Sequence, residues 1–102
     1  MSDLVQENKS TKTFGPYSPI RQVGDLYFTA GHIGVDSSTG QASPDITAQT
    51  KQTMDNLTAT LASAGLTLDD IVKTTIFLTD MGDFAAVNEA YTSYFNGVRP
   101  AR

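Results

Sequence analysis

The spacing of apolar positions in the first half of the chain predicts a hairpin. A turn-rich segment, GPYSP at 15–19, precedes two short apolar pieces, Ile20–Val23 and 26–30. Gly24-Asp25 separates the two pieces, and a Gly-containing pair between apolar runs is typical of a tight β-hairpin. The polar stretch VDSSTGQ at 35–41 predicts a further turn. We also expect a weak strand at 4–7.

The apolar spacing then lengthens to that of a helix. Ser43 and Pro44 are expected to be its N-cap and first residue, and Gly65 is expected to follow its last turn. The apolar residues at approximately helical spacing between these limits are Ile46, Met54, Leu57, Leu61 and Ala64.

The second half of the chain predicts one more strand and one more helix. The run IVKTTIFL at 71–78 is rich in β-branched residues and is interpreted as a strand. Asp80 is expected to cap a helix that ends at about Phe95, with Asp83 in a box-like arrangement three residues later. The order β-β-α-β-α predicts an α+β fold, with one mixed sheet and two helices on one of its faces.

Composition narrows the class of protein. A chain of 102 residues, 39% apolar and 18% charged, is the size of one domain spanning residues 1–102. The net charge of -4 and the scattered basic residues argue against binding to nucleic acid. The absence of cysteine excludes disulfides and thiolate metal sites. No apolar run reaches the length of a membrane span, so we expect a cytoplasmic protein that does not bind membranes.

One polar residue interrupts the apolar face of the second predicted helix. Asn88 lies within this face, about 40° from Phe84 at the helical angle of about 100° per residue. A buried amide without a partner costs about 1–3 kcal/mol. Asn88 therefore either reaches a loop carbonyl or water, or it serves a site. The apolar residues of the face are Phe84, Val87, Tyr91, Tyr94 and Phe95.

Four more positions are candidates for chemistry, and each has a plain structural alternative. Tyr17 could close the core with a solvated hydroxyl, and Gly31 could mark a bend or an exposed backbone. The single histidine, His32, cannot form a zinc site alone, and neither a G-x-S-x-G elbow nor a G-x-G-x-x-G loop is present. Arg102 could be a solvated charge, or its planar fork could bind a carboxylate.

Taken together, these positions resemble the RidA/YjgF family of reactive-intermediate (enamine/imine) deaminases. The resemblance covers nearly the whole chain, from about Asn8 to Arg102, in the order and with the spacing of the family. The segments that carry it are GPYS at 15–18, TAGHIG at 29–34, the spacing of Gln49, Gln52, Asn56 and Leu57, DIVKTTIFLTDMGDFAAVNEAY at 70–91 and RPAR at 99–102.

The resemblance implies a fold, an activity and a site. The family fold is a chorismate-mutase-like α+β subunit in a homotrimer with a barrel-like centre and clefts between subunits. The family reaction converts 2-imino acids such as 2-iminobutanoate and 2-iminopropanoate to 2-oxo acids and ammonia, without a cofactor or metal, as metabolite damage control. By the same resemblance, Arg102 binds the substrate carboxylate, Tyr17 lines the cleft, Gly31 offers backbone groups to the imine, and Asn88 lies beside the site.

The chain also departs from the family pattern. Family members continue beyond the PAR step through two strands, and the last of them carries a glutamate that is thought to help activate water. We therefore expect this chain to be a fragment; a partner covering the open sheet edge, or a shorter, weaker variant, are the alternatives. No catalytic residue is assigned, although His32 is a speculative stand-in for the proton-transfer group. The alternative functions are a non-catalytic carboxylate-binding module and a translation inhibitor or ribonuclease.

Overall fold

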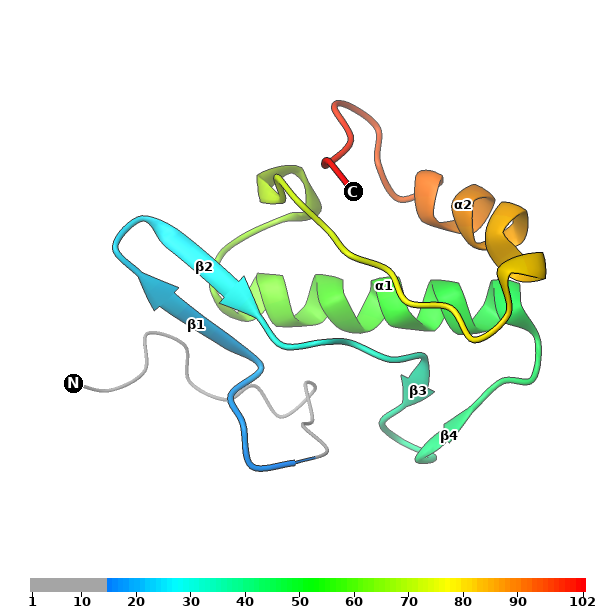
Figure 1. Cartoon of the computed structure of the whole chain (residues 1–102). Coiled ribbons are helices and arrows are strands. Elements are labelled where there is room, and N and C mark those ends of the chain that lie inside the picture. The colour runs from blue at the N-terminus through cyan, green and yellow to red at the C-terminus, as the bar shows by residue number, and fades with distance from the viewer. Residues whose placement is uncertain (1–14) are drawn as a thin grey trace.

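The computed structural model describes residues 15–102, so the strand predicted at 4–7 lies outside the described residues. The long helix α1 runs through the middle of the molecule. One hairpin lies near each end of α1, and helix α2 lies above its N-terminal half in the view of Figure 1. The elements in order are β1 (Ile20–Val23), β2 (Leu26–Thr29), β3 (Val35–Asp36), β4 (Gln41–Ala42), α1 (Ile46–Ser63), the 3-10 turns η1 (Leu68–Asp70) and η2 (Met81–Asp83), and α2 (Phe84–Thr92). The described residues contain no helix that is long and apolar enough to cross a membrane.

The hairpin predicted around Gly24-Asp25 is confirmed. β1 and β2 pair antiparallel, with Ile20 opposite Thr29 and Val23 opposite Leu26. Gly24 has a φ of 58°, while among residues 15–102 no residue other than glycine has a positive φ. A positive φ at the first turn position alone is the type II′ arrangement, which follows the right-handed twist of the two strands.

The predicted polar turn joins β3 to β4. Oδ1 of Asp36 accepts hydrogen bonds from the backbone N–H of Ser38 at 2.9 Å and from its hydroxyl at 2.7 Å. These two bonds lower the pKa of Asp36, the side-chain bond having the larger effect. Gly40 closes the turn with a φ of 71°.

Helix α1 begins two residues later than predicted. Asp45, not Ser43, is the N-cap, and its Oδ2 accepts a 2.9 Å hydrogen bond from the N–H of Ala48. The carbonyl of Asp45 also accepts the first helical bond, from the N–H of Gln49 at 2.9 Å, as the carbonyl of an N-cap residue does. The hydroxyl of Ser43 instead accepts from the N–H of Asp45 at 3.1 Å, and Pro44 lies outside the helix.

The end of α1 follows the prediction. Gly65 has a φ of 75°. Its N–H donates to the carbonyl of Ala62, and the N–H of Leu66 donates to the carbonyl of Leu61. This pair of bonds is the Schellman motif, which accounts for glycine at this position.

Helix α2 is shorter than predicted at both ends. Asp80 caps the 3-10 turn η2 through a 2.8 Å bond from the N–H of Gly82, and α2 begins only at Phe84, without the expected box from Asp83. The helix ends at Thr92 rather than near Phe95. The hydroxyl of Ser93 bonds the carbonyl of Ala90 at 2.7 Å, a local bond that competes with further helical pairing.

The strand predicted at 71–78 is not formed as a ladder. Among residues 15–102 this segment has one parallel bridge, between Lys73 and Ala101, and the hairpins form two separate antiparallel sheets. The single mixed sheet of the prediction is therefore wrong for the described part of the chain. β-branched residues favour an extended backbone. A ladder also needs a partner strand, and in the described part of the chain each hairpin pairs only with itself.

The core has two clusters. One centres on Ile20 and Leu61, where the β1–β2 hairpin packs on α1, and the other on Met54, Tyr91 and Phe95, where α1 meets α2 and the residues after it. The rings of Tyr91 and Phe95 meet at 4.9 Å between centroids with a tilt of 54°. Phe84, expected on the buried face of α2, is 46% exposed and lies at the end of this core.

Candidate functional site

Arg102 and Asn88, two of the predicted site residues, are in direct contact. Nη1 of Arg102 donates a 2.6 Å hydrogen bond to Oδ1 of Asn88, which gives the polar amide on the apolar face of α2 a partner. Within residues 15–102 the guanidinium makes no ion pair with a carboxylate. The structure thus orients a positive charge without neutralising it, although the chain has a net charge of -4.

Two aromatic rings complete the surroundings of the guanidinium. Cζ of Arg102 lies 5.8 Å from the ring centroid of Phe84 and 5.2 Å from that of Tyr91. Both distances are within the range of a cation–π interaction. Sequence reasoning assigned Phe84 and Tyr91 to the core alone. Phe84 and Tyr91 are four residues before and three residues after Asn88, so all three lie on one face of the helix. This spacing is the signal that could have identified the two rings as neighbours of the site.

The backbone next to Arg102 is fixed by the 71–78 segment. The N–H of Thr74 donates to the carbonyl of Ala101 at 2.8 Å, and the N–H of Ala101 donates to the carbonyl of Val72 at 3.0 Å. These bonds place the guanidinium over α2. The Arg102 group therefore consists of residues 84, 88, 91 and 102.

Tyr17 and Gly31, the other two predicted site residues, lie in a different place. The segments that contain them are neighbours, because the N–H of Ala30 donates to the carbonyl of Pro19 at 3.0 Å. Tyr17 is 46% exposed, and a Cβ added to Gly31 would meet no atom within 4 Å, so both line an open surface. In Figure 1 the segment 15–19 and the C-terminus are on opposite sides of α1. The predicted site residues therefore fall into two separate groups within one chain, and we call residues 17 and 31 the Tyr17 group.

His32 connects the loop after β2 to α1. Its Nδ1 lies 2.9 Å from the carbonyl oxygen of Ala30, and its Nε2 lies 2.8 Å from the hydroxyl oxygen of the buried Thr60. A carbonyl can only accept, so Nδ1 carries the proton and Nε2 accepts from Thr60. Burial lowers the pKa of His32, and the bond to Ala30 opposes this effect in part. Both ring nitrogens are occupied by these two hydrogen bonds, which weighs against the speculative proton-transfer role of His32.

Stability is expected to fall when the solution is acidified, and His32 is expected to contribute. The folded protein has the lower pKa, so the unfolded chain takes up the proton first as the pH drops below its ordinary value near 6.5. The His32 contribution is complete above that pH and is lost as the pH falls through the folded pKa. Urea unfolding of wild type and His32→Gln at pH 7.5 and 5.5 measures it as the difference between the two pH dependences. Identical dependences would contradict the assignment.

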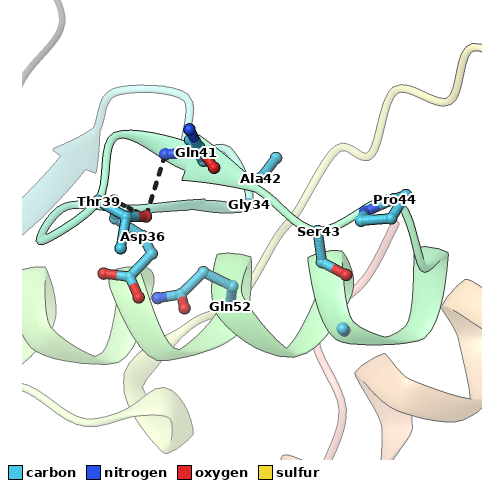
Figure 2. Close-up of a pocket in the computed structure, with 9 residues that line it drawn as sticks. Gly34, Asp36, Thr39, Gln41, Ala42, Ser43, Pro44 and Gln52 are labelled. Carbon is cyan, nitrogen blue, oxygen red and sulfur yellow. Dashed lines mark hydrogen bonds between the residues drawn. The ribbon is translucent and has the colours of Figure 1, made fainter.

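A polar hollow elsewhere on the surface contains none of the predicted site residues. It has a volume of about 380 Å³ and lies between the β3–β4 hairpin and the first turns of α1. Figure 2 shows the side chains of Asp36 and Gln52 on its floor, below Thr39 and Gln41. Its only charged lining residue is an acid, so it is unsuited to a carboxylate ligand. The described residues also contain no cluster of three or more His, Cys, Asp or Glu side chains that could hold a metal ion.

Comparison with known proteins agrees with this architecture. The family model described as Endoribonuclease L-PSP matches residues 7–102. A RutC family protein of Pyrococcus abyssi is 43% identical over 98% of this chain and 80% of its own length. The 2-iminobutanoate/2-iminopropanoate deaminase of Escherichia coli K12 is 39% identical over 100% of this chain and 82% of its own length.

Solved structures show the same fold. The YjgF gene product of E. coli superposes with a TM-score of 0.88 at 39% identity, covering 100% of this chain and 82% of that one. E. coli TdcF with bound serine gives a TM-score of 0.90 at 33% identity, covering 99% of this chain and 82% of that one. The predicted α+β class is therefore confirmed.

Proposed function

Because this chain belongs to the RidA/YjgF family, we propose that it hydrolyses reactive 2-imino acids to 2-oxo acids and ammonia. The substrates we propose are 2-iminobutanoate and 2-iminopropanoate, and the cellular role is the removal of damaging metabolites in the cytoplasm. The observation that carries the proposal is Arg102: a cation without a carboxylate partner in the described chain, held by Asn88 and two rings. A similar protein, TdcF, has been crystallised with serine, itself a small carboxylate.

Arg102 supplies the main binding interaction. One donor, Nη1, is engaged by Asn88, so the remaining edge of the guanidinium can offer two parallel N–H groups to the substrate carboxylate. Such a forked contact fixes the orientation of the imine carbon relative to the carboxylate. Because an imine already hydrolyses in water, this positioning accounts for a modest acceleration without a cofactor.

The reaction itself is an addition followed by an elimination. Water adds to the imine carbon: a C–O bond forms, the C=N π bond breaks, and one proton of the water passes to the nitrogen. In the resulting carbinolamine the amino nitrogen takes up a second proton, the C–N bond breaks and ammonia leaves, while the hydroxyl group loses its proton to give the 2-oxo acid. We assign no side chain to the proton transfers; Gly31 is proposed to offer its backbone groups to the imine end.

The separation of the Arg102 group from the Tyr17 group favours an assembly of subunits. The Arg102 group and the Tyr17 group lie on opposite sides of α1, so one small ligand cannot contact both within one chain (Figure 1). We propose a homotrimer with a barrel-like centre, in which each cleft combines the Arg102 group of one subunit with Tyr17 and Gly31 of the next. The chorismate-mutase-like packing implied by the family supports this arrangement.

Two other functions deserve comparison. A non-catalytic module would keep the Arg102 group and bind a 2-oxo acid without turnover. A ribonuclease or translation inhibitor is suggested by the Endoribonuclease L-PSP description of the family model. The net charge of -4 and the lack of a cationic cluster weigh against a role on RNA.

The test of the proposed function is the decay of 2-iminobutanoate generated in situ by a threonine dehydratase. We expect the wild-type chain to accelerate formation of 2-oxobutanoate and ammonia in proportion to its concentration. Thermal stabilisation by 2-oxobutanoate without acceleration would select the binding module, and RNA cleavage by the pure protein would select the ribonuclease. Neither acceleration nor stabilisation by a folded chain would contradict the carboxylate site altogether.

A further inference from the structure

Thr74 makes two hydrogen bonds to the surroundings of Arg102, one to the backbone before it and one to the ring beside it. Its backbone N–H donates to the carbonyl of Ala101 at 2.8 Å, directly before Arg102 in the chain. Its hydroxyl lies 2.8 Å from the hydroxyl of Tyr91, across the core on α2. One residue therefore connects the backbone that carries the guanidinium to the ring beneath it.

The ring of Tyr91 is held on several sides. It is only 4% exposed, and it packs with Met54 and Phe95 in one of the two core clusters. Its buried hydroxyl needs a hydrogen-bond partner, and the partner is on the segment beside Arg102. Its hydroxyl bond to Thr74 fixes the ring plane relative to the segment beside Arg102.

The guanidinium lies against this fixed ring. Cζ of Arg102 is 5.2 Å from the centroid of Tyr91, closer than the 5.8 Å to the more exposed Phe84. Asn88 holds Nη1 between the two rings along the helix. A long arginine side chain loses rotamer freedom when it is fixed, so a support that fixes it before the ligand arrives improves binding.

We propose that Tyr91, locked by Thr74, is a positioning residue that holds the Arg102 guanidinium ready for the substrate carboxylate. The proposal rests on the proposed function, because it names a further residue of the same site. Tyr91 acts through Arg102 and does not itself touch the substrate. Its loss should therefore weaken binding much more than it slows the chemical step.

The test compares three variants in binding of 2-oxobutanoate and in imine hydrolysis. Tyr91→Leu removes the ring and is expected to raise the Kd and KM about tenfold, within the range of a desolvated cation–π contact, while kcat changes less than about threefold. Tyr91→Phe keeps the ring and loses only the bond to Thr74, so its Kd should lie between those of wild type and Tyr91→Leu.

Phe95→Leu is the matched control. Phe95 belongs to the same core cluster and contacts the ring of Tyr91, but in the described part of the chain it makes no cation–π contact with Arg102. Its substitution should lower the unfolding temperature as much as Tyr91→Leu does, while the Kd stays within about twofold of wild type. Equal weakening of binding in both leucine variants would overturn the proposal, since loss of packing alone would then explain it.

A second readout does not depend on activity. The Nε–H signal of Arg102 in the NMR spectrum of the ligand-free protein should be shifted by the ring current of Tyr91 and exchange slowly with water. Tyr91→Leu should move this signal toward the position of a free arginine, with the remaining shift due to Phe84, and Phe95→Leu should leave it in place. An unshifted wild-type signal would refute the positioning role, even if the protein proves active. A shifted signal in a wild-type protein that neither binds nor hydrolyses would support the positioning and refute only the proposed function.

Discussion

Replacement of Arg102 with alanine is expected to lower kcat/KM for 2-iminobutanoate by about 100-fold or more. A hydrogen bond to a charged group is worth about 1.5–3 kcal/mol, and the forked contact contains two of them. Asn88 and the two rings hold the guanidinium but offer no positive charge to replace it. Arg102→Lys keeps the charge without the planar fork, so a loss of about tenfold is expected, seen mainly in KM.

Arg99 provides the control for this measurement. It is an exposed arginine three residues earlier in the same segment. Arg99→Ala changes the net charge by the same amount as Arg102→Ala and should keep kcat/KM within about twofold. If the two alanine variants lose activity equally, the effect is one of overall charge, and Arg102 does not bind the carboxylate.

Substitution of Gly34 with alanine is expected to destabilise the fold by about 2–3 kcal/mol, a large part of the stability of a small domain. A Cβ at this position would collide with the backbone carbonyl oxygen of Gln49, and it would lie 3.0 Å from the carbonyl carbon and from the Cα of the same residue. The obstacle is the backbone of α1, which cannot rotate away as a side chain can.

The segment around Gly34 has little freedom to retreat from the helix. Nδ2 of Asn56 donates to the carbonyl of Ile33 at 3.0 Å and to that of Val35 at 2.9 Å, so one amide of α1 holds both sides of the glycine. Gly34→Ala must strain or break these bonds. Urea unfolding monitored by circular dichroism measures the loss.

Gly97→Ala is the control for Gly34→Ala. A Cβ at Gly97 meets no atom within 4 Å, and its φ is not in the left-handed region. The free energy of unfolding should therefore change by no more than about 0.5 kcal/mol. A Gly34 variant as stable as the Gly97 variant would mean that the β3 segment does not rest on α1 as closely as the structure shows.

Local features of the chain were predicted well, and the arrangement of partners was not. The hairpin at Gly24-Asp25 and the end of α1 at Gly65 depend on glycine within a few residues of sequence, so they were readable. The strand predicted at 71–78 is absent from the described residues apart from the bridge between Lys73 and Ala101, because a ladder depends on which strand lies alongside. The cap of α1 was misplaced by two residues because Ser43 and Asp45 both suit the role, and the hydrogen bond to Ala48 decided between them.

The sequence by itself determined the α+β class and the family resemblance, and the helical period showed that Asn88 lies on an apolar face. The site roles of Arg102 and Asn88 came from the resemblance. Only the tertiary structure decided that Arg102 and Asn88 touch, that the rings of Phe84 and Tyr91 lie within cation–π distance of the guanidinium, and that Tyr17 and Gly31 lie in a separate group. It also decided that Gly34 is packed tightly against α1. These contacts join segments that are far apart in the chain, so they depend on tertiary packing and cannot be inferred from local sequence patterns.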